Sequence, residues 1–473
     1  MERRQKVGLV IAATGLAQFM AALDNLVVTT ALPTIREHLH AGLSSLEWTV
    51  NAYTLAFATL LIAGAALGDK FGRKRIFQIG IFVFTIASAS AALSNSITAL
   101  VVSRSVQGIG GALMVPLSLT LLSDGVPKER RNFALGIWGA LGGLAIAIGP
   151  LVGGAVVQIA NWQWIFWLNV PTGVVLLLLT RLAFNKNTKL PKQLDLSGLI
   201  LVTMGLFGLV NGLINGSSKG WTNNAVIASF ITSAITLAAF ILVERRKSEP
   251  MVPLAIFRST NFSIINAASL LMSFGLFGSV FFLSQYFQLI QGLSPVASGI
   301  RILPWTAMPI LVTPFLGGLV NKYGGERLVQ IGLSLQAVGL GWIAIVIAVH
   351  SSYPSLVGAF VIAGVGTALF FVPTASITLE SAGPKMEAIA SGVNNSLREV
   401  GGALGIATLG AVFTGFGGFS TPTAFIDGLR PAITVGALLL ACAALITIKL
   451  RRSHHLQEGE VTMEYLEDGL QKV

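Results

Sequence analysis

The chain has few charged residues and a single cysteine. Only 11% of its 473 residues are Asp, Glu, Lys or Arg, whereas a soluble domain carries about 25%. A soluble fold of this length could not hide a hydrophobic content of 53%, but lipid can solvate it. The one cysteine, Cys442, excludes an intrachain disulfide and any metal site built from several cysteines. These shortages point to a membrane protein.

The sequence also lacks the patterns of an enzyme or a nucleotide-binding protein. No glycine-rich string ends in the GKS or GKT of a phosphate-binding loop, and the five histidines are scattered. The net charge of +11 comes from short basic clusters between apolar runs, a pattern typical of loops that face anionic lipid. We therefore expect no catalysis, no metal or organic cofactor, and no nucleic-acid partner.

Apolar runs of membrane-spanning length make up most of the chain. A spanning helix needs about 20 residues, and the first such run, 7–32, is too long for the apolar core of a cleaved signal. The fold class predicted is therefore an all-α polytopic membrane protein with fourteen transmembrane helices. The runs are centred near residues 20, 57, 85, 110, 146, 173, 206, 234, 275, 309, 338, 367, 402 and 439.

Basic residues are distributed very unevenly between successive loops. With a cytoplasmic N-terminus, 25 of the 31 Lys and Arg residues fall in cytoplasmic segments, four fall outside and two lie within spans. Positive charge collects on the cytoplasmic side of membrane proteins, and one miscounted helix would reverse the later clusters. The bias predicts a multi-pass membrane protein with both termini in the cytoplasm, and the membrane we expect is a bacterial inner membrane.

Basic, proline-containing loops divide the fourteen runs into six, two and six. The predicted units are 1–185, a two-helix insertion at 186–258, a second bundle at 259–452, and a cytoplasmic tail at 453–473. The loop GAALGDKFGRKR in the first bundle is echoed by GGLVNKYGGER in the second. Such internal repeats are typical of transporters built from two pseudo-symmetric bundles.

Five segments resemble motifs of the major facilitator superfamily, in particular its fourteen-helix drug:proton antiporter branch. They are GAALGDKFGRKR between helices 2 and 3, LDNLVVTTALP in helix 1, RSVQGIGGA in helix 4, AIGPLVGG in helix 5 and WQWIFWLNVP at helix 6. The resemblance covers essentially the whole chain. It implies a major facilitator fold and proton-driven export of amphipathic, often cationic, compounds by alternating access.

Three ionisable residues lie deep inside predicted spans, where charge is costly and marks candidate functional sites. Asp24 and Arg104 share a depth in helices 1 and 4, so we expect them to face each other. Glu399 lies near the centre of helix 13, beside Arg398. The resemblance implies a coupling acid and an arginine at the positions of Asp24 and Arg104. All three are the predicted proton-coupling residues.

Each of these residues could instead have a purely structural role. Asp24 and Arg104 could form a static ion pair that only fixes helix packing. Glu399 could be satisfied by Arg398, or by Asn394 and Asn395 one turn away. Four further acids lie near helix ends, where we expect them to reach water: Glu47, Asp124, Glu380 and Asp427.

Two glycine-rich segments are candidate gates. Glycines permit a tight reversal between helices 2 and 3 and a smooth face on helix 5, which Pro150 bends. Asp69 could cap the next helix or pair with a neighbouring cation, although a solvated charge cluster and ordinary small-residue packing would explain the same residues. The predicted gate residues are Gly64, Asp69, Gly72, Arg73, Gly149, Pro150 and Gly154.

A site for amphipathic compounds needs aromatic and polar side chains around a central cavity. Aromatic side chains in membrane helices also commonly face lipid or core. Some polyspecific members of the resembled family carry an extra acid in helix 10, and this chain has none there. The resemblance therefore implies that divalent cationic drugs are less expected as substrates than monovalent or neutral ones. The predicted cavity residues are Gln18, Asn51, Tyr53, Gln107, Trp138, Phe282, Gln285, Trp305, Asn395 and Arg398.

The sequence thus predicts a monomeric, proton-coupled exporter of drug-like compounds, with protons as the coupling ion and the lipid bilayer as its surroundings. A dedicated exporter of one metabolite, lipid or peptide class is the alternative within transport. A membrane scaffold or sensor is the alternative outside it. The scaffold would not need two charges matched in depth, and the dedicated exporter would show a narrow substrate profile.

Overall fold

The computed structural model describes residues 2–184, 195–248, 250–383 and 386–450, which contain helices and no strand. Fourteen of the described segments are long and apolar enough to cross a membrane. Each contains one of the predicted centres, so the predicted all-α fold with fourteen spans is confirmed. A membrane leaves backbone groups no water to bond, and helices satisfy those groups within each span.

The described helices fall into three consecutive sets. The first set is α1 Glu2–His38, α2 Leu43–Phe71, α3 Arg73–Ala92, α4 Ile97–Gly125, α5 Lys128–Ile159, α6 Trp164–Trp167 and α7 Asn169–Ala183. The second is α8 Leu196–Lys219 and α9 Asn224–Arg246, followed by the short η1 Leu254–Arg258. The third is α10 Thr260–Gln285, η2 Tyr286–Ile290, α11 Pro295–Thr306, α12 Met308–Tyr323, α13 Gly325–Val346, α14 Tyr353–Ala382, α15 Glu387–Phe416 and α16 Pro422–Thr447.

Two predicted spans are interrupted. The sixth consists of α6 and α7, and the tenth consists of α11 and α12, which meet at Ala307. Pro304 and Pro309 flank that junction, and each proline removes a backbone donor from the helical ladder. The ninth span ends in a π-helical turn, η2. The span count therefore holds although the helix count is higher.

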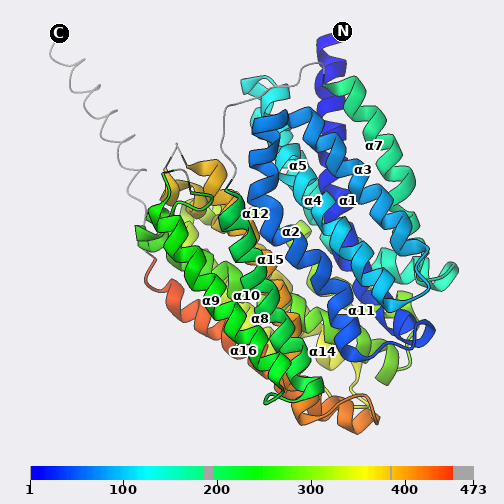
Figure 1. The fold of residues 1–473 in the computed structure, drawn as a ribbon. Coiled ribbons are helices and arrows are strands. Elements are labelled where there is room, and N and C mark those ends of the chain that lie inside the picture. The colour runs from blue at the N-terminus through cyan, green and yellow to red at the C-terminus, as the bar shows by residue number, and fades with distance from the viewer. Residues whose placement is uncertain (1, 185–194, 249, 384–385, 451–473) are drawn as a thin grey trace.

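The first and third sets each pack mainly within themselves, and α8 lies against α2 and α15 with α9 packed on it (Figure 1). We call the first set the N-bundle and the third set the C-bundle. The domain boundaries predicted at 185 and 258 remain predictions. The predicted tail, 453–473, lies outside the described residues.

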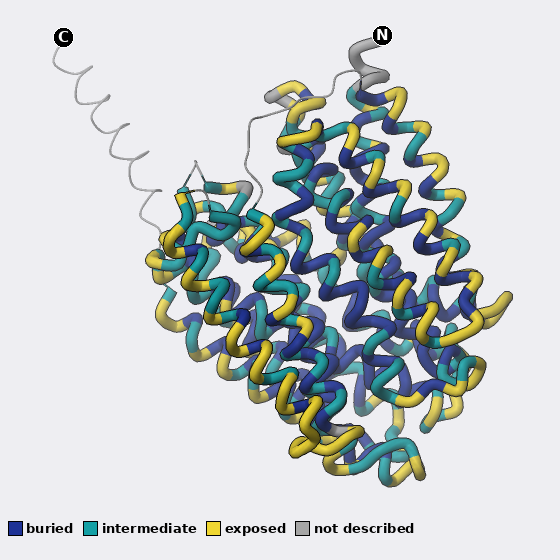
Figure 2. Tube along the Cα trace, viewed as in Figure 1, coloured by how far each residue is buried: buried dark blue, intermediate teal, exposed yellow. Residues whose placement is uncertain are grey.

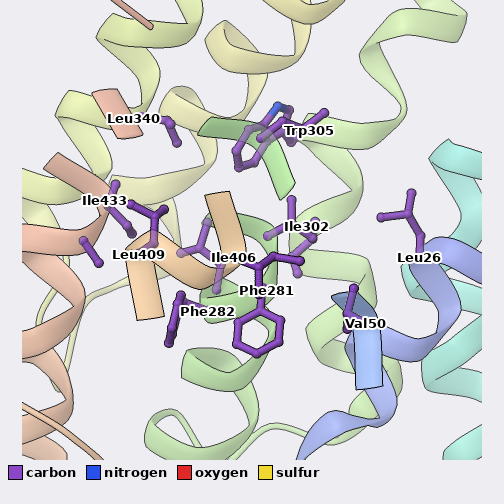
Figure 3. Close-up of a cluster of buried hydrophobic side chains, with 14 of the residues drawn as sticks. Leu26, Val50, Phe281, Phe282, Ile302, Trp305, Leu340, Ile406, Leu409 and Ile433 are labelled. Carbon is purple, nitrogen blue, oxygen red and sulfur yellow. The ribbon is translucent and has the colours of Figure 1, made fainter. Parts of the chain in front are cut away.

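Both bundles contribute side chains to one large buried apolar cluster. Leu26 of α1 and Val50 of α2 lie beside Phe281 and Ile302 of the C-bundle (Figure 3). Exposed apolar residues instead lie on outward faces, most plainly on α9 (Figure 2). Such a surface would be a liability in water and is the expected lipid-facing surface of a membrane protein.

The two ends of the molecule differ. One end, which we call the basic end, carries the connection from α2 to α3, where Gly72 has φ 107°, and that from α12 to α13, where Gly324 has φ 84°. Glycine adopts such positive φ values without steric cost, so both echoed loops reverse at a glycine. The opposite end, the far end, carries the connections from α1 to α2 and from α15 to α16.

Candidate functional site

A buried ion pair lies inside the N-bundle. Arg104 Nη1 of α4 donates to Asp24 Oδ2 of α1, and both side chains are almost fully withdrawn from solvent. The matching depth of these residues in the sequence predicted that they would face each other, and this geometry is confirmed. Their role in proton coupling stays a prediction.

Two amides complete the surroundings of the Asp24 carboxylate. Its Oδ1 accepts hydrogen bonds from Gln107 Nε2 at 2.8 Å and from Asn169 Nδ2 at 2.7 Å. Gln107 Oε1 also accepts from Arg104 Nη1 at 2.8 Å, and Asn169 reaches Ser88 Oγ at 3.1 Å. The carboxylate is thus bound by side chains from α4 and α7. A proton that binds to it would have to replace some of these hydrogen bonds.

The arginine of this pair is held from two further sides. Arg104 Nε donates to the carbonyl of Thr49 on α2 at 3.2 Å. Its guanidinium lies 4.4 Å from the centre of the Tyr53 ring, a favourable placement for a cation over an aromatic face. Tyr53 in turn donates to the Ala21 carbonyl of α1 at 3.3 Å. The network therefore links α1, α2, α4 and α7.

Glu399 of α15 lies between the two bundles. It accepts from Asn25 Nδ2 of α1 at 3.5 Å, directly beside Asp24 in the chain. Arg398 points elsewhere, because its Nη1 donates to Asn395 at 3.3 Å and its guanidinium lies 4.4 Å from the Phe371 ring centre. Among the described residues these two neighbouring charges form no ion pair, and Glu399 is an acid of the C-bundle that reaches the N-bundle.

The face of α5 that carries Ala147, Pro150 and Gly154 packs against α11 toward the far end. Thr306 Oγ1 donates to the Ala147 carbonyl at 2.9 Å. A Cβ on Gly154 would lie 2.6 Å from the carbonyl carbon of Pro295, so only glycine permits this approach. The same close packing holds Pro150 against the C-bundle.

The same face of α5 is open toward the basic end. Heptad spacing places Gly136 and Gly143 on the stripe of Pro150, yet a Cβ on either would meet nothing within 4 Å. The side chains of Leu311 and Phe315 on α12, which continues from α11, are exposed by 58% and 71%. The bundles are therefore closed together at the far end, and α5 and α12 separate toward the basic end, although α2 still touches α15 there through Ile62.

Further contacts between the bundles lie at the far end. Gln288 of η2 donates to the Thr30 carbonyl of α1 at 3.0 Å. The Arg36 guanidinium lies 3.8 Å from the centre of the Phe419 ring, which belongs to the connection between α15 and α16. These contacts would have to break if the far end opened.

The predicted gate at the basic end is an ion-pair cluster within the N-bundle. Arg73 of α3 donates to Asp69 of α2 at 2.9 Å and to Asp124 of α4 at 2.5 Å. Of the two roles considered for Asp69, pairing with a cation is the one observed. Gly64 of α2 packs directly against the Ala112 backbone of α4, because a Cβ there would overlap the Ala112 carbonyl oxygen. Glycine thus allows α2 and α4 to approach closely.

The predicted cavity residues separate into two groups. Those partly exposed between the bundles or near them are Gln18, Trp138, Asn395 and Arg398. Those fully buried in this conformation are Asn51, Tyr53, Gln107, Phe282, Gln285 and Trp305. The buried group forms core packing or the ion-pair network here, so contact with a substrate would require another conformation.

Sequence reasoning missed two residues of the site and misjudged a third. Asn169 and Asn25 touch the candidate coupling acids but were not singled out, although each is an amide in an apolar span. Glu47 was expected to reach water because it lies near a helix end. That expectation is wrong: Glu47 is only 1% exposed, because α15 covers it.

Comparison with known proteins identifies the family. The Major Facilitator Superfamily model matches residues 14–406, and the chain belongs to that superfamily. It is 35% identical to the "Tetracenomycin C resistance and export protein" of Streptomyces glaucescens, over 89% of this chain and 78% of that protein. It is 31% identical to the "Methylenomycin A resistance protein" of Bacillus subtilis, over 85% and 86%.

A third relative has a broader name. "Multidrug resistance protein Stp" of Mycobacterium tuberculosis (strain ATCC 25618 / H37Rv) is 33% identical over 87% of this chain and 76% of that protein. Among solved structures, a POT family transporter in complex with a thioalcohol conjugated peptide has a TM-score of 0.70 at 15% identity, covering 93% of this chain and 95% of that one. That likeness concerns the fold alone. The chain is a multi-pass membrane transporter of the major facilitator fold.

Proposed function

We propose that this transporter is a proton-coupled antiporter that exports amphipathic cationic or neutral compounds by alternating access. The single observation that carries the proposal is the grouping of Asp24, Arg104 and Glu399 at one depth of the spans, next to the region where the two bundles meet. The names of the relatives support the direction and substrate class, since they denote antibiotic or multidrug resistance.

Movement of charged partners would provide the coupling chemistry. A buried carboxylate is favoured by a nearby cation and by hydrogen-bond donors, and a proton can replace them. If rocking of the bundles moves Glu399 away from Asn25, or a rearrangement of α1 and α4 within the N-bundle moves Arg104 away from Asp24, proton affinity changes with the conformation. The proton supplies the coupling, and no other cofactor enters the proposal.

The basic end is assigned to the cytoplasm. Positive loops favour that side, and both termini then lie in the cytoplasm of a bacterial cell membrane. In this orientation the structure opens toward the cytoplasm, the side from which an exporter takes its substrate. A monomer would suffice, because one chain contains both bundles and both candidate coupling acids, Asp24 and Glu399.

A pH-gradient flux assay in everted membrane vesicles tests the proposal. Wild type should move substrate when a proton gradient is imposed, and Asp24→Asn should abolish that movement while leaving the protein level unchanged. Glu37→Gln is the control, because Glu37 is an exposed carboxylate of the same helix. Unchanged flux in Asp24→Asn would refute the coupling role of Asp24.

A dedicated exporter of one compound class is the second candidate. Two relatives are each named for resistance to one compound, tetracenomycin C and methylenomycin A, which favours a narrow substrate profile. The vesicle assay distinguishes the candidates when it is run across a panel of cations, zwitterions, neutral compounds and lipids. Transport of one class alone would support the dedicated exporter, whereas transport of several unrelated cations would support the broader function.

A further inference from the structure

Glu47 is a buried acid that the proposed coupling does not use. It lies one turn from the start of α2, at the far end, and its residue is 1% exposed. Its carboxyl lies directly over the backbone of α15, because a Cβ on Gly410 would overlap Glu47 Oε1. This is a contact between the N-bundle and the C-bundle at the closed end.

No cation of the described residues forms an ion pair with the Glu47 carboxyl. Glu47 Oε1 is buried and accepts no hydrogen bond from the described residues. Asn51 lies one turn further along α2, and its amide nitrogen and oxygen are equally without partners. A carboxylate placed here would lose its hydration without gaining a cation or a donor, whereas a protonated carboxyl carries no net charge.

The charged groups on the neighbouring helices are engaged elsewhere or lie apart. On α4, Arg104 is bound to Asp24 and to the Thr49 carbonyl. On α1, Arg36 lies over Phe419, while Glu37 and His38 are exposed. On α8, Lys219 is exposed in the last turn. On α15, Arg398 and Glu399 lie three turns away, and α3 has charged residues only near its other end.

We propose that Glu47 is a proton-operated latch of the far end: α2 closes onto α15 at Gly410 only when Glu47 carries a proton. Opening of the far end separates the two helices, exposes the carboxyl to water and releases the proton to the side from which it came. This proton is not carried across the membrane, so the latch adds nothing to the exchange stoichiometry. Acidity on the far side drives closure there and resets the transporter. The latch rests on the proposed alternating access.

Distances between two labels across the far end test this latch. Cysteines at Ser44 of α2 and Ser420 of the C-bundle carry spin labels in a Cys442→Ser background, and the purified full chain is studied in lipid nanodiscs without substrate. One linked proton changes the ratio of closed to open molecules by up to about ten-fold per pH unit. The wild-type chain should close its far end as the pH falls.

Glu47→Gln mimics the protonated acid with an uncharged side chain of the same shape. We expect the far end of this variant to remain closed at high pH. The pH dependence of its closed-to-open ratio should correspond to one linked proton fewer than in wild type. Glu37→Gln, at the same end but exposed, should keep the wild-type response. Gly410→Ala should favour the open far end at every pH, because its Cβ occupies the place of the Glu47 carboxyl.

The proposal fails if Glu47→Gln keeps the full wild-type slope, or if Gly410→Ala leaves the distance distribution unchanged. Asp24→Asn separates the latch from the exchange mechanism. In that variant the far end should still respond to pH through Glu47 even when flux is lost. A chain that exports nothing but keeps a Glu47-dependent response would overturn the proposed function and support the latch.

Discussion

At the residue scale, the site is defined by how each buried charge is balanced. Asp24 has a cation and two amide donors, Glu399 has one long hydrogen bond from Asn25, and Glu47 has no partner among the described residues. Burial without partners is costly for ions. The three acids should therefore differ in how readily they exchange protons with water.

Asn169 should stabilise the Asp24 carboxylate. We expect Asn169→Ala to lower the free energy of unfolding in wild type but to have a smaller effect in an Asp24→Asn background. Hydrogen bonds between membrane helices give coupling energies of about 0.6 kcal/mol on average and about 1.7 kcal/mol at most. A double-mutant cycle on thermal unfolding in detergent measures this coupling. Equal effects in the two backgrounds would show that Asn169 acts independently of Asp24.

The sequence predicted the Asp24–Arg104 pair but not its amide partners. Depth along a helix follows from counting residues, so two charges at one depth can be matched. Which side chain faces Asp24 depends on the rotation of α7 about its axis, and an apolar run that faces both lipid and protein does not reveal it. Glu47 was misjudged for a related reason, because its distance from the helix end does not show that α15 covers it.

At the element scale, the stripe of small residues on α5 connects packing to movement. Toward the far end, the backbone of this stripe at Gly154 packs directly against the backbone of α11. Toward the basic end, a Cβ on Gly136 or Gly143 would meet no atom within 4 Å. The segment AIGPLVGG allowed this smooth face to be predicted, whereas its partner, and the break between α11 and α12 at Ala307, came only from tertiary structure. One helix thus contributes to the closed end and to the opening.

Gly154→Ala and Gly143→Ala form a matched pair on this helix. In Gly154→Ala the new methyl group would press on Pro295, and overpacking of this kind costs about 1–3 kcal/mol. The closed far end should therefore be disfavoured roughly 5–150-fold, as measured by the label pair at Ser44 and Ser420. Gly143→Ala meets open space and should leave the distances unchanged. Equal behaviour of both variants would contradict the role given to the α5–α11 contact.

The α8–α9 pair is held at the basic end by Asp195, which caps α8. Burial raises the pKa of this carboxyl, but hydrogen bonds from Lys247 and the Gly198 amide outweigh that effect and hold the pKa well below its ordinary value. Its stabilising contribution is then complete above the unfolded pKa of about 3.9 and is lost as the pH falls through the folded value. Asp195→Asn keeps a capping side chain and removes only the charge.

We expect Asp195→Asn to unfold at a lower temperature than wild type at pH 7, with a difference that narrows toward pH 3. Thermal unfolding at both pH values measures it. Ser197→Ala, which removes a weaker partner of the same carboxylate, should have a smaller effect. A difference that grows as the pH falls would contradict the depressed pKa.

At the scale of the whole molecule, lipid determines most of what the sequence reveals. Every span must be helical and apolar, so all fourteen could be located from hydropathy, and the charge bias predicts their orientation. The arrangement of the bundles is a property of contacts between distant segments, such as Thr306 with Ala147 and Gln288 with Thr30. These polar contacts join the bundles at the centre and toward the far end, while α2 and α15 also touch toward the basic end, where Ile62 packs against α15. The rocking movement of the bundles stays part of the proposed function.

Proton exchange driven by the substrate is the most direct test of the central claim. Purified wild type is reconstituted in vesicles that contain a pH-sensitive dye, and a gradient of a transported cation is imposed with the membrane potential clamped. Antiport predicts proton movement opposite to the substrate in wild type and none in Asp24→Asn. Substrate movement without any proton movement in wild type would contradict the account.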